Sequence, residues 1–299
     1  MTHDEILAIP AKLLPQEARE AYFRNGYVGV DALVGEDWLG PLRDVTQEFI
    51  EMSRHVAGKD ARFDLEPDHS AKAPRIRRLN SPVELHEVYW RFASEGPFVD
   101  VAEDLLGPNI KFHHSKLNFK WGTGGEEVKW HQDIQFWPHT NYDVLTIGVY
   151  LDPVTEDMAP MGVIPGSHEG PLYDLYGHDG EWTGNIRDED LSQIDAETAG
   201  YIAGSAGTVT VHNCRAIHGS RPNLSDRSRP LLLCAYSAAD AFPITNLTRG
   251  ASKSEVRLRG EPARWARFDP RPCLMPPDWS KQGGYKSIFE HQQREAGRG

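Results

Sequence analysis

This sequence has few cysteines, too few basic residues to balance its acidic ones, and no long apolar run. Its three cysteines, Cys214, Cys234 and Cys273, form no CxxC pair, which excludes a disulfide framework and predicts reduced thiols. Lysine and arginine total 32 against 44 aspartates and glutamates, a formal net charge of −12. That charge disfavours phosphate backbones and anionic lipids, and no apolar run approaches the ~20 residues of a membrane span. We therefore expect neither nucleic-acid nor membrane partners.

The start of the chain and its composition indicate an ordinary globular protein. Met1–Glu5 lacks the basic start and apolar core of a secretory signal, which together with reduced thiols predicts a cytoplasmic location. Hydrophobic residues make up 39% and charged residues 25% of the 299 positions, as in folded domains rather than disordered chains. We expect one domain over residues 1–299, because β-rich single domains often reach ~200–250 residues and accept additions. Its oligomeric state is not readable.

Helical spacing of apolar residues dominates the first part of the chain, residues 1–108. Between the helical segments, the pattern of Tyr27–Val30 predicts a short strand. Lys59–Asn80 is polar and shows no hydrophobic periodicity, which predicts a loop that could act as a lid. The predicted helices are Glu17–Asn25, ended by Gly26, then Glu36–Arg54, and then Pro82–Leu106, broken at Gly96-Pro97.

Residues 109–240 instead contain short runs rich in β-branched and aromatic residues, separated by turn residues. Five or more such runs favour a sandwich or jelly roll, so the predicted fold is mainly β with helical decorations. Gly170–Gly200 is expected to be a surface insertion or a substrate loop, and residues 241–299 a C-terminal extension. The predicted strands are Phe112–Trp121, Val128–Gln132, Val144–Leu151, Gly207–His212 and Leu231–Ala238.

The segment Trp130-His131-Gln132-Asp133 carries the first chemical signal. On a strand, His131 and Asp133 point to the same face, because side chains alternate. With a second histidine they would form the 2-His-1-carboxylate triad that is diagnostic of non-haem Fe(II) oxygenases. The pair alone is weak, since 13 histidines give about one His-x-Asp by chance. A solvated polar pair on an exposed strand face is the competing interpretation.

A second segment offers the missing histidine and a cation. It runs from His212 through His218-Gly219-Ser220 to Arg229, which lies eleven positions after His218 at the start of an apolar strand. A guanidinium buried there needs an anionic partner, which a bound dicarboxylate would supply as a bidentate pair. The competing interpretation of Arg229 is a surface arginine beside a turn. His212 is not followed by Gly-Ser, which makes it the weaker candidate ligand.

Taken together, these motifs resemble the phytanoyl-CoA dioxygenase family of Fe(II)/2-oxoglutarate oxygenases, nearest to its bacterial ectoine hydroxylase-like branch. Position 114 is histidine where that branch has glutamine, and Ile134-Gln135-Phe136-Trp137 replaces its aromatic-acidic run, which argues against the branch's own substrate. The resemblance spans most of residues 20–240. Its motifs, in order, are Phe23-Arg24-Asn25-Gly26-Tyr27, His114–Lys120, His131-x-Asp133, Ile164-Pro165-Gly166-Ser167-His168, His218-Gly219-Ser220 and Arg229.

The resemblance implies a cupin-like double-stranded β-helix core that is supported by N-terminal helices. It also implies a role for each of several site residues. His131, Asp133 and His218 would ligate Fe(II), and Arg229 with Ser220 would hold the far carboxylate of the co-substrate 2-oxoglutarate. Asn118 would touch the co-substrate as well, and dioxygen completes the reaction. Because Asp133 is present, hydroxylation or desaturation of a small organic metabolite is favoured over halogenation. The residues expected around the substrate pocket are His114, Phe136, Trp137 and Phe242.

Three alternatives stay open. An acyl-CoA 2-hydroxylase would use Arg75, Arg77 and Arg78 for the CoA phosphates, although a solvated basic loop fits the charge better. A non-catalytic cupin-like binding protein would hold a metal or a small ligand. A zinc hydrolase ranks low, because no HExxH or CxxC accompanies the triad. The substrate is not readable, since specificity is expected in Lys59–Asn80, Gly170–Gly200 and the segment after Phe242.

Overall fold

The structure, a computed structural model, describes residues 1–122, 125–245, 251–279 and 288–291, and in these ranges two antiparallel sheets form the centre of the molecule. Part of the predicted specificity segment after Phe242 and of the C-terminal extension lies outside the described residues. The large sheet has the order β1 (Tyr27–Val30), β9 (Val209–Asn213), β6 (Val144–Tyr150), β11 (Leu231–Ala238), β4 (Ile110–Asn118), β3 (Ile76–Asn80) and β2 (Phe63–Leu65), with β12 (Arg257–Arg259) also pairing with β4. The small sheet has the order β5 (Val128–His131), β10 (His218–Ser220), β7 (Met161–Val163) and β8 (Gly200–Ile202).

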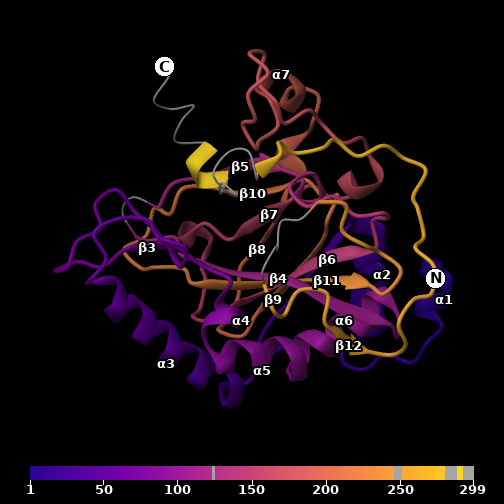
Figure 1. The fold of residues 1–299 in the computed structure, drawn as a ribbon, viewed down its shortest axis with the longest axis horizontal. Coiled ribbons are helices and arrows are strands. Elements are labelled where there is room, and N and C mark those ends of the chain that lie inside the picture. The colour runs from indigo at the N-terminus through magenta and orange to yellow at the C-terminus, as the bar shows by residue number, and fades with distance from the viewer. Residues whose placement is uncertain (123–124, 246–250, 280–287, 292–299) are drawn as a thin grey trace.

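Helices from the N-terminal third cover one face of the large sheet (Figure 1). None of the helices in the described part of the chain is long and apolar enough to cross a bilayer. The α-helices are α1 (His3–Leu7), α2 (Gln16–Asn25), α3 (Glu36–Ser53), α4 (Pro82–Leu85), α5 (Glu87–Glu95), α6 (Pro97–Leu106) and α7 (Asp188–Leu191). Short 3₁₀ turns are η1 (Asp133–Gln135), η2 (Glu156–Met158), η3 (Ser167–Glu169) and η4 (Ala196–Thr198).

The predicted helix boundaries follow local sequence. α2 ends at Gly26, whose φ of 79° places it in the left-handed region that terminates helices, and its N–H donates to the Tyr22 carbonyl. Pro97 begins α6 directly after Gly96, because proline suits the first helical position and lacks the donor that a continuing helix needs. The helical stretch over Pro82–Leu106 is thus broken at Gly96-Pro97 as predicted, and the extended backbone of His86 adds a second break, which makes three helices.

The central strands of the large sheet are buried on both faces, and their two faces differ. On β9, Val209 and Val211 belong to the apolar core beneath the helices, whereas Thr210 and His212 point to the other side. β6 alternates in the same way, with Thr146 on the side of His212. These polar residues of β9 and β6 face the space between the two sheets, and the functional site lies in this space.

Two sequence-based expectations on local structure were wrong. Lys59–Asn80 is not wholly a loop, because β2 and β3 form within it and extend the large sheet beyond β4. Asp133 is not on the strand of His131: β5 ends at His131 and Asp133 begins η1. Gly170–Gly200 is largely irregular, as expected, and it packs Leu175, Trp182 and Ile186 into the apolar cluster that also contains Phe136.

Candidate metal centre

Antiparallel pairing of β5 with β10 brings two histidines together. His131, the last residue of β5, lies opposite His218, the first residue of β10. Gly219 lets the strands approach, because a Cβ there would lie 2.7 Å from the Val128 carbonyl oxygen. The η1 turn then folds Asp133 back beside both imidazoles. The residues expected to share a metal therefore meet, although a turn rather than strand alternation positions the carboxylate.

The donor atoms of His131, Asp133 and His218 all lie within 4.8 Å of one another, and the three residues are buried. Asp133 Oδ1 is 3.9 Å from His131 Nε2 and 3.8 Å from His218 Nε2. His131 Nδ1 bonds to the Lys129 carbonyl at 2.8 Å and His218 Nδ1 to the Ala216 carbonyl at 3.0 Å. These bonds place the Nδ1 protons on the carbonyl side and leave both Nε2 lone pairs free for a metal.

The charge state of the three residues also suits a cation. Burial lowers the pKa of His131 to about 4, and burial together with His131 and His212 holds the pKa of His218 well below its ordinary value. Burial alone would raise the pKa of Asp133, but Lys116, His218 and a bond from His212 hold it well below 3.8. Two neutral imidazoles and one carboxylate therefore face each other at neutral pH, the donor set that Fe(II) takes in facial triads.

Asp133 is supported from the large sheet by Thr146, which the sequence analysis did not single out, and by His212, which it ranked as the weaker candidate ligand. Asp133 Oδ2 accepts a hydrogen bond from Thr146 Oγ1 at 3.1 Å and lies 3.3 Å from His212 Nε2. His212 is therefore not in the triad but directly behind it. The polar residues at alternate positions of two apolar strands were the available signal, since such residues need partners when buried.

Arg229 lies in the interior, not at the surface. It is 4% exposed, its Nε has no hydrogen-bond partner among the described residues, and no described carboxylate pairs with it. Lys120 lies nearby, and burial followed by the charge of Arg229 lowers its pKa to about 6. Lys120 Nζ donates to Ser220 Oγ at 2.7 Å and to the carbonyls of Ser220 and Arg221. Glu66 and Glu126 line the same cavity, but neither forms an ion pair with Arg229, and a buried guanidinium of this kind forms a site for an anion.

Asn118 joins this anion site. Asn118, Lys120 and Arg229 line one small cavity, and Asn118 Oδ1 accepts from Arg78 Nε at 2.9 Å. Lys120 was not predicted as a site residue, because a lysine at the end of a β-strand is usually solvated. Its burial follows from the pairing of Lys120 with Arg229 across the backbone, N–H to carbonyl in both directions.

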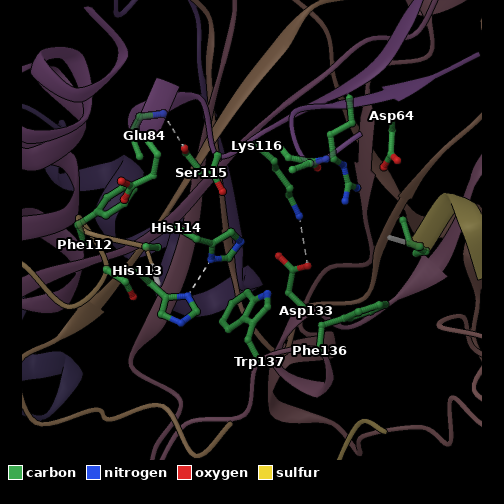
Figure 2. A pocket seen from close by; sticks show the side chains of 18 of the residues that line it. Asp64, Glu84, Phe112, His113, His114, Ser115, Lys116, Asp133, Phe136 and Trp137 are labelled. Atoms are coloured by element: carbon green, nitrogen blue, oxygen red, sulfur yellow. Dashed lines mark hydrogen bonds and ion pairs between the residues drawn. The ribbon is translucent and has the colours of Figure 1, made fainter. Parts of the chain in front are cut away.

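A larger cavity of about 430 Å³ opens beside Asp133 and His131 (Figure 2). His114, Phe136 and Trp137 line it, as expected from the sequence. Lys116 points to Asp133 from the opposite wall, with Nζ 3.7 Å from Oδ1. Phe242, expected beside the pocket, is not among its described lining residues. It is 36% exposed and instead packs on Lys111, whose Nζ lies 4.1 Å from the ring centre.

The three arginines considered for CoA phosphates are neither a solvated loop nor a free basic patch. Arg77 and Arg78 lie buried on β3. Arg77 pairs with Glu66 at 2.7 Å and Glu126 at 3.3 Å, and Arg75 pairs with Asp68 at 2.9 Å. Arg78 bonds to Asn118 and stacks over the Phe289 ring.

Comparison with known proteins decides the family. The profile of the phytanoyl-CoA dioxygenase (PhyH) family matches residues 22–231. The chain belongs to this family. One curated relative, a probable alpha-ketoglutarate-dependent hypophosphite dioxygenase of Stutzerimonas stutzeri, is 33% identical over 93% of this chain and 96% of its own length. L-proline trans-4-hydroxylase of Streptomyces griseoviridis is 27% identical over 79% of this chain and 91% of its own.

Solved structures of the same type agree with this membership of the PhyH family. EctD from S. alaskensis with bound Fe superposes with a TM-score of 0.66, at 24% identity over 89% of this chain and 91% of that one. EctD with 2-oxoglutarate and 5-hydroxyectoine gives 0.63, at 22% identity over 91% of both chains. The fold is thus the double-stranded β-helix of these dioxygenases. The protein is a 2-oxoglutarate-dependent non-haem iron dioxygenase that uses Fe(II), and the alternatives of a non-catalytic binder and a zinc hydrolase are set aside.

Proposed function

We propose that this dioxygenase hydroxylates a C–H bond of a small polar organic molecule and releases succinate and carbon dioxide. The cavity beside the triad supports the proposal. Its volume of about 430 Å³ falls within the ~300–1,000 Å³ of small-molecule sites. Its lining combines polar groups with the rings of Phe136 and Trp137, as in sites that hold an organic molecule in one orientation. Desaturation of the same C–H position is the alternative outcome of this site.

In this proposal His131, Asp133 and His218 hold the iron. With 2-oxoglutarate and dioxygen, the bound metal supplies the oxidising power for the C–H bond. The chain supplies the geometry: the Nδ1 bonds of both histidines and the two donors to Asp133 Oδ2 fix the ligand atoms before the metal arrives. Burial of all three ligands keeps bulk water away from the reacting centre.

The anion site would bind the far carboxylate of 2-oxoglutarate. Arg229 pairs with it through the guanidinium that lacks a protein acid, and Ser220 donates its hydroxyl proton. Lys120 positions that hydroxyl, because its Nζ donates to Oγ and so leaves the Ser220 proton free to point elsewhere. Asn118 contacts the co-substrate with its amide nitrogen, since its Oδ1 is already bonded to Arg78.

Charges around the cavity suggest that the substrate carries an anionic group. Lys116 Nζ lies 3.7 Å from Asp133 Oδ1. Once that oxygen binds Fe(II), the ammonium loses much of this attraction and needs another negative partner. A carboxylate or similar group on the substrate would supply it. His114 and Ser115 on the same wall offer neutral hydrogen bonds beside Lys116.

Oxidation of hypophosphite at a P–H bond is the second candidate, because similarity to the S. stutzeri relative extends over nearly the whole of both chains. The cavity is larger than this small anion requires, which is why an organic substrate is preferred. An acyl-CoA thioester is less favoured than a free acid, since Arg75 and Arg77 already pair with acidic side chains.

Succinate formation by purified protein with Fe(II), 2-oxoglutarate, ascorbate and air tests the co-substrate site. Slow, iron-dependent succinate production is expected from the wild type and a drop of at least tenfold from Arg229→Ala, because the far carboxylate then faces no arginine. The control is Arg227→Ala, whose side chain bonds to Thr155 and Met158 instead. Absence of succinate, together with no anaerobic binding of 2-oxoglutarate, would contradict the proposal.

A panel of substrates tests the reaction itself. Candidate free acids, the matching CoA thioesters, L-proline, ectoine and hypophosphite are compared for faster succinate release and for product by mass spectrometry. A gain of 16 mass units in an organic acid supports hydroxylation, and a loss of 2 units supports desaturation. Coupled turnover of hypophosphite alone would replace the organic-substrate proposal by the second candidate.

A further inference from the structure

Besides the iron ligands, one other group of metal-type donors converges in the described part of the chain. It consists of His113 on β4, His139 after η1, and Glu255 before β12. One donor atom from each lies within 4.8 Å of the other two. His113 is 1% and His139 is 3% exposed, and their ring centres are 4.7 Å apart. His113 also lines the substrate cavity, so this group, called the His-His-Glu cluster, adjoins the active site (Figure 2).

Two donor atoms of the cluster are buried without any hydrogen-bond partner among the described residues, namely His139 Nε2 and Glu255 Oε1. His139 Nδ1 bonds to the Trp137 carbonyl at 2.7 Å. That bond places the proton on Nδ1 and the lone pair on Nε2, the arrangement already seen in His131 and His218. Leaving such acceptors unsatisfied costs about 1–3 kcal/mol each, so a bound ligand is indicated.

The backbone holds Glu255 toward the two imidazoles. Its φ of 62° lies in the left-handed region, where residues other than glycine are uncommon. Its N–H donates to the Phe112 carbonyl at 2.8 Å, and its Oε2 accepts from Lys111 Nζ at 2.6 Å. With Oε2 so engaged, Oε1 is the free oxygen. A sparsely populated conformation that presents an unpartnered carboxylate oxygen is typical of functional sites.

The protonation state of the two imidazoles suits a metal ion. Burial lowers the pKa of His139 to about 4, and burial together with His114 and His139 holds the pKa of His113 well below its ordinary value. Both imidazoles are therefore neutral near pH 7, as metal ligands must be. The charges of Lys111 and Glu255 cancel. Two imidazole nitrogens and one carboxylate oxygen match the ligand set of Zn²⁺ with one open position.

We propose that His113, His139 and Glu255 bind a second divalent metal ion, best matched by Zn²⁺, next to the substrate cavity. His113 Nδ1 is 2.7 Å from His114 Nδ1, so its Nε2 is the atom left for the metal. A metal on Nε2 fixes the His113 proton on Nδ1, which then donates to His114. His114 in turn carries its proton on Nε2 and becomes a hydrogen-bond donor in the cavity wall. The ion thereby sets the polarity that the substrate meets.

Zinc binding by tag-free protein tests the site without relying on turnover. In a His131→Ala/His218→Ala background, which removes two iron ligands, titration against a chelating dye is expected to show one equivalent of Zn²⁺. Adding Glu255→Gln or His139→Gln is expected to weaken that binding at least tenfold. His178→Gln is the matched control, because His178 is exposed and lies 3.2 Å from a carboxylate of Glu189. It should change nothing.

A metal count on the wild type gives an independent result that needs no altered iron site. Protein loaded with Fe(II) and then Zn²⁺ is expected to hold about two metal ions per chain, as measured by inductively coupled plasma mass spectrometry. The Glu255→Gln variant is expected to hold about one. Circular dichroism confirms that each variant is folded. One ion per chain in the wild type, or zinc binding that survives both Glu255→Gln and His139→Gln, overturns the proposal. Neither outcome depends on succinate formation, so failure here is distinct from failure of the proposed reaction.

Discussion

The two oxygens of Asp133 have different partners. Oδ1 faces the Nε2 atoms of His131 and His218, whereas Oδ2 is bonded to Thr146 and His212 on the large sheet. A carboxylate with one oxygen anchored cannot rotate freely, so the other is presented to the metal in a fixed direction. Partners of this kind commonly change metal affinity ten- to a hundredfold when removed.

We therefore expect His212→Ala to weaken Fe(II) binding by about 10–100-fold while leaving the three ligands in place. Anaerobic Fe(II) titration measures the affinity. His212→Gln should recover part of it, because the glutamine amide can donate to Oδ2. The control is Thr210→Val, two residues earlier on the same face of β9, whose buried hydroxyl has no partner among the described residues. If His212→Ala bound iron as tightly as Thr210→Val, the positioning role would be wrong.

Arg229 and Lys120 show how one residue's environment depends on another. Sequence reasoning identified Arg229 from its spacing to His218, and its missing acid partner fits that reasoning. Lys120 carries no such spacing signal. Its interior position arises because Lys120 and Arg229 exchange backbone hydrogen bonds and both side chains turn to the same side of the strands. A single sequence without register information does not show that these two basic residues share a site.

Among the elements, the β5–β10 pair determines the distance between the two histidine ligands. Gly219→Ala would place a Cβ 2.7 Å from the Val128 carbonyl oxygen and 3.2 Å from the Trp130 ring. The strands must then separate, which moves His218 away from His131. We expect Gly219→Ala to reduce iron affinity and succinate formation at least tenfold, measured by Fe(II) titration and by the uncoupled assay.

Gly40→Ala is the control for this substitution. Gly40 lies within α3, and an added Cβ there meets nothing within 4 Å. Alanine should stabilise the helix by about 0.5–1 kcal/mol without changing iron binding. Equal iron affinity in Gly219→Ala and Gly40→Ala would show that the close approach of the strands is not required.

The elements also show which parts of the fold the sequence could predict. β1 and β11 match their predicted ranges, because β-branched and aromatic runs between turns identify strands well. β10 consists of His218-Gly219-Ser220, three residues with no strand preference. It is a strand because β5 and β7 flank it and supply its hydrogen bonds. Pairing of this kind is a tertiary effect, invisible in local composition.

Much of the candidate site could also be predicted from the sequence. His131, Asp133, His218 and Arg229 were identified from their motifs together with the resemblance to the family, although the turn that carries Asp133 was not foreseen. Phe242 was placed wrongly, because an aromatic residue after a strand gives no indication of which face it covers. Arg78 and Asn80 line the cavity, in agreement with the expected role of Lys59–Asn80 in specificity, but the strand β3 that carries them was not predicted, since this polar segment has no strand period.

For the molecule as a whole, the burial of histidines has a consequence for acid stability. Burial is the first cause that lowers the pKa of six of them below the ordinary 6.5: His113, His114, His131, His139, His168 and His218. The pKa falls to about 4 for His131 and His139 and to about 3 for His114. In the unfolded chain the pKa of each of these side chains returns to its ordinary value of about 6.5.

The sign of the effect follows from proton uptake. Above pH 6.5 the histidines are neutral in both states, so folding carries no penalty. Below it the unfolded chain binds protons that the native interior refuses, and the free energy of unfolding falls as the pH drops toward 4. Each histidine contributes a slope approaching about 1.4 kcal/mol per pH unit. Because native proteins are stable by only about 5–15 kcal/mol, a few such groups acting together are enough to unfold the chain.

We expect the metal-free protein to lose stability steeply between pH 6.5 and 5. This range lies at higher pH than the range in which protonation of carboxylates alone would destabilise the protein. Urea denaturation at pH 7, 6 and 5 measures the loss as a falling midpoint at constant slope, because a constant slope shows that the surface exposed on unfolding is unchanged. Bound metal should shift the fall to lower pH, since it competes with protons for His131 and His218. Equal midpoints from pH 7 to 5 would mean that water reaches these histidines in the native state.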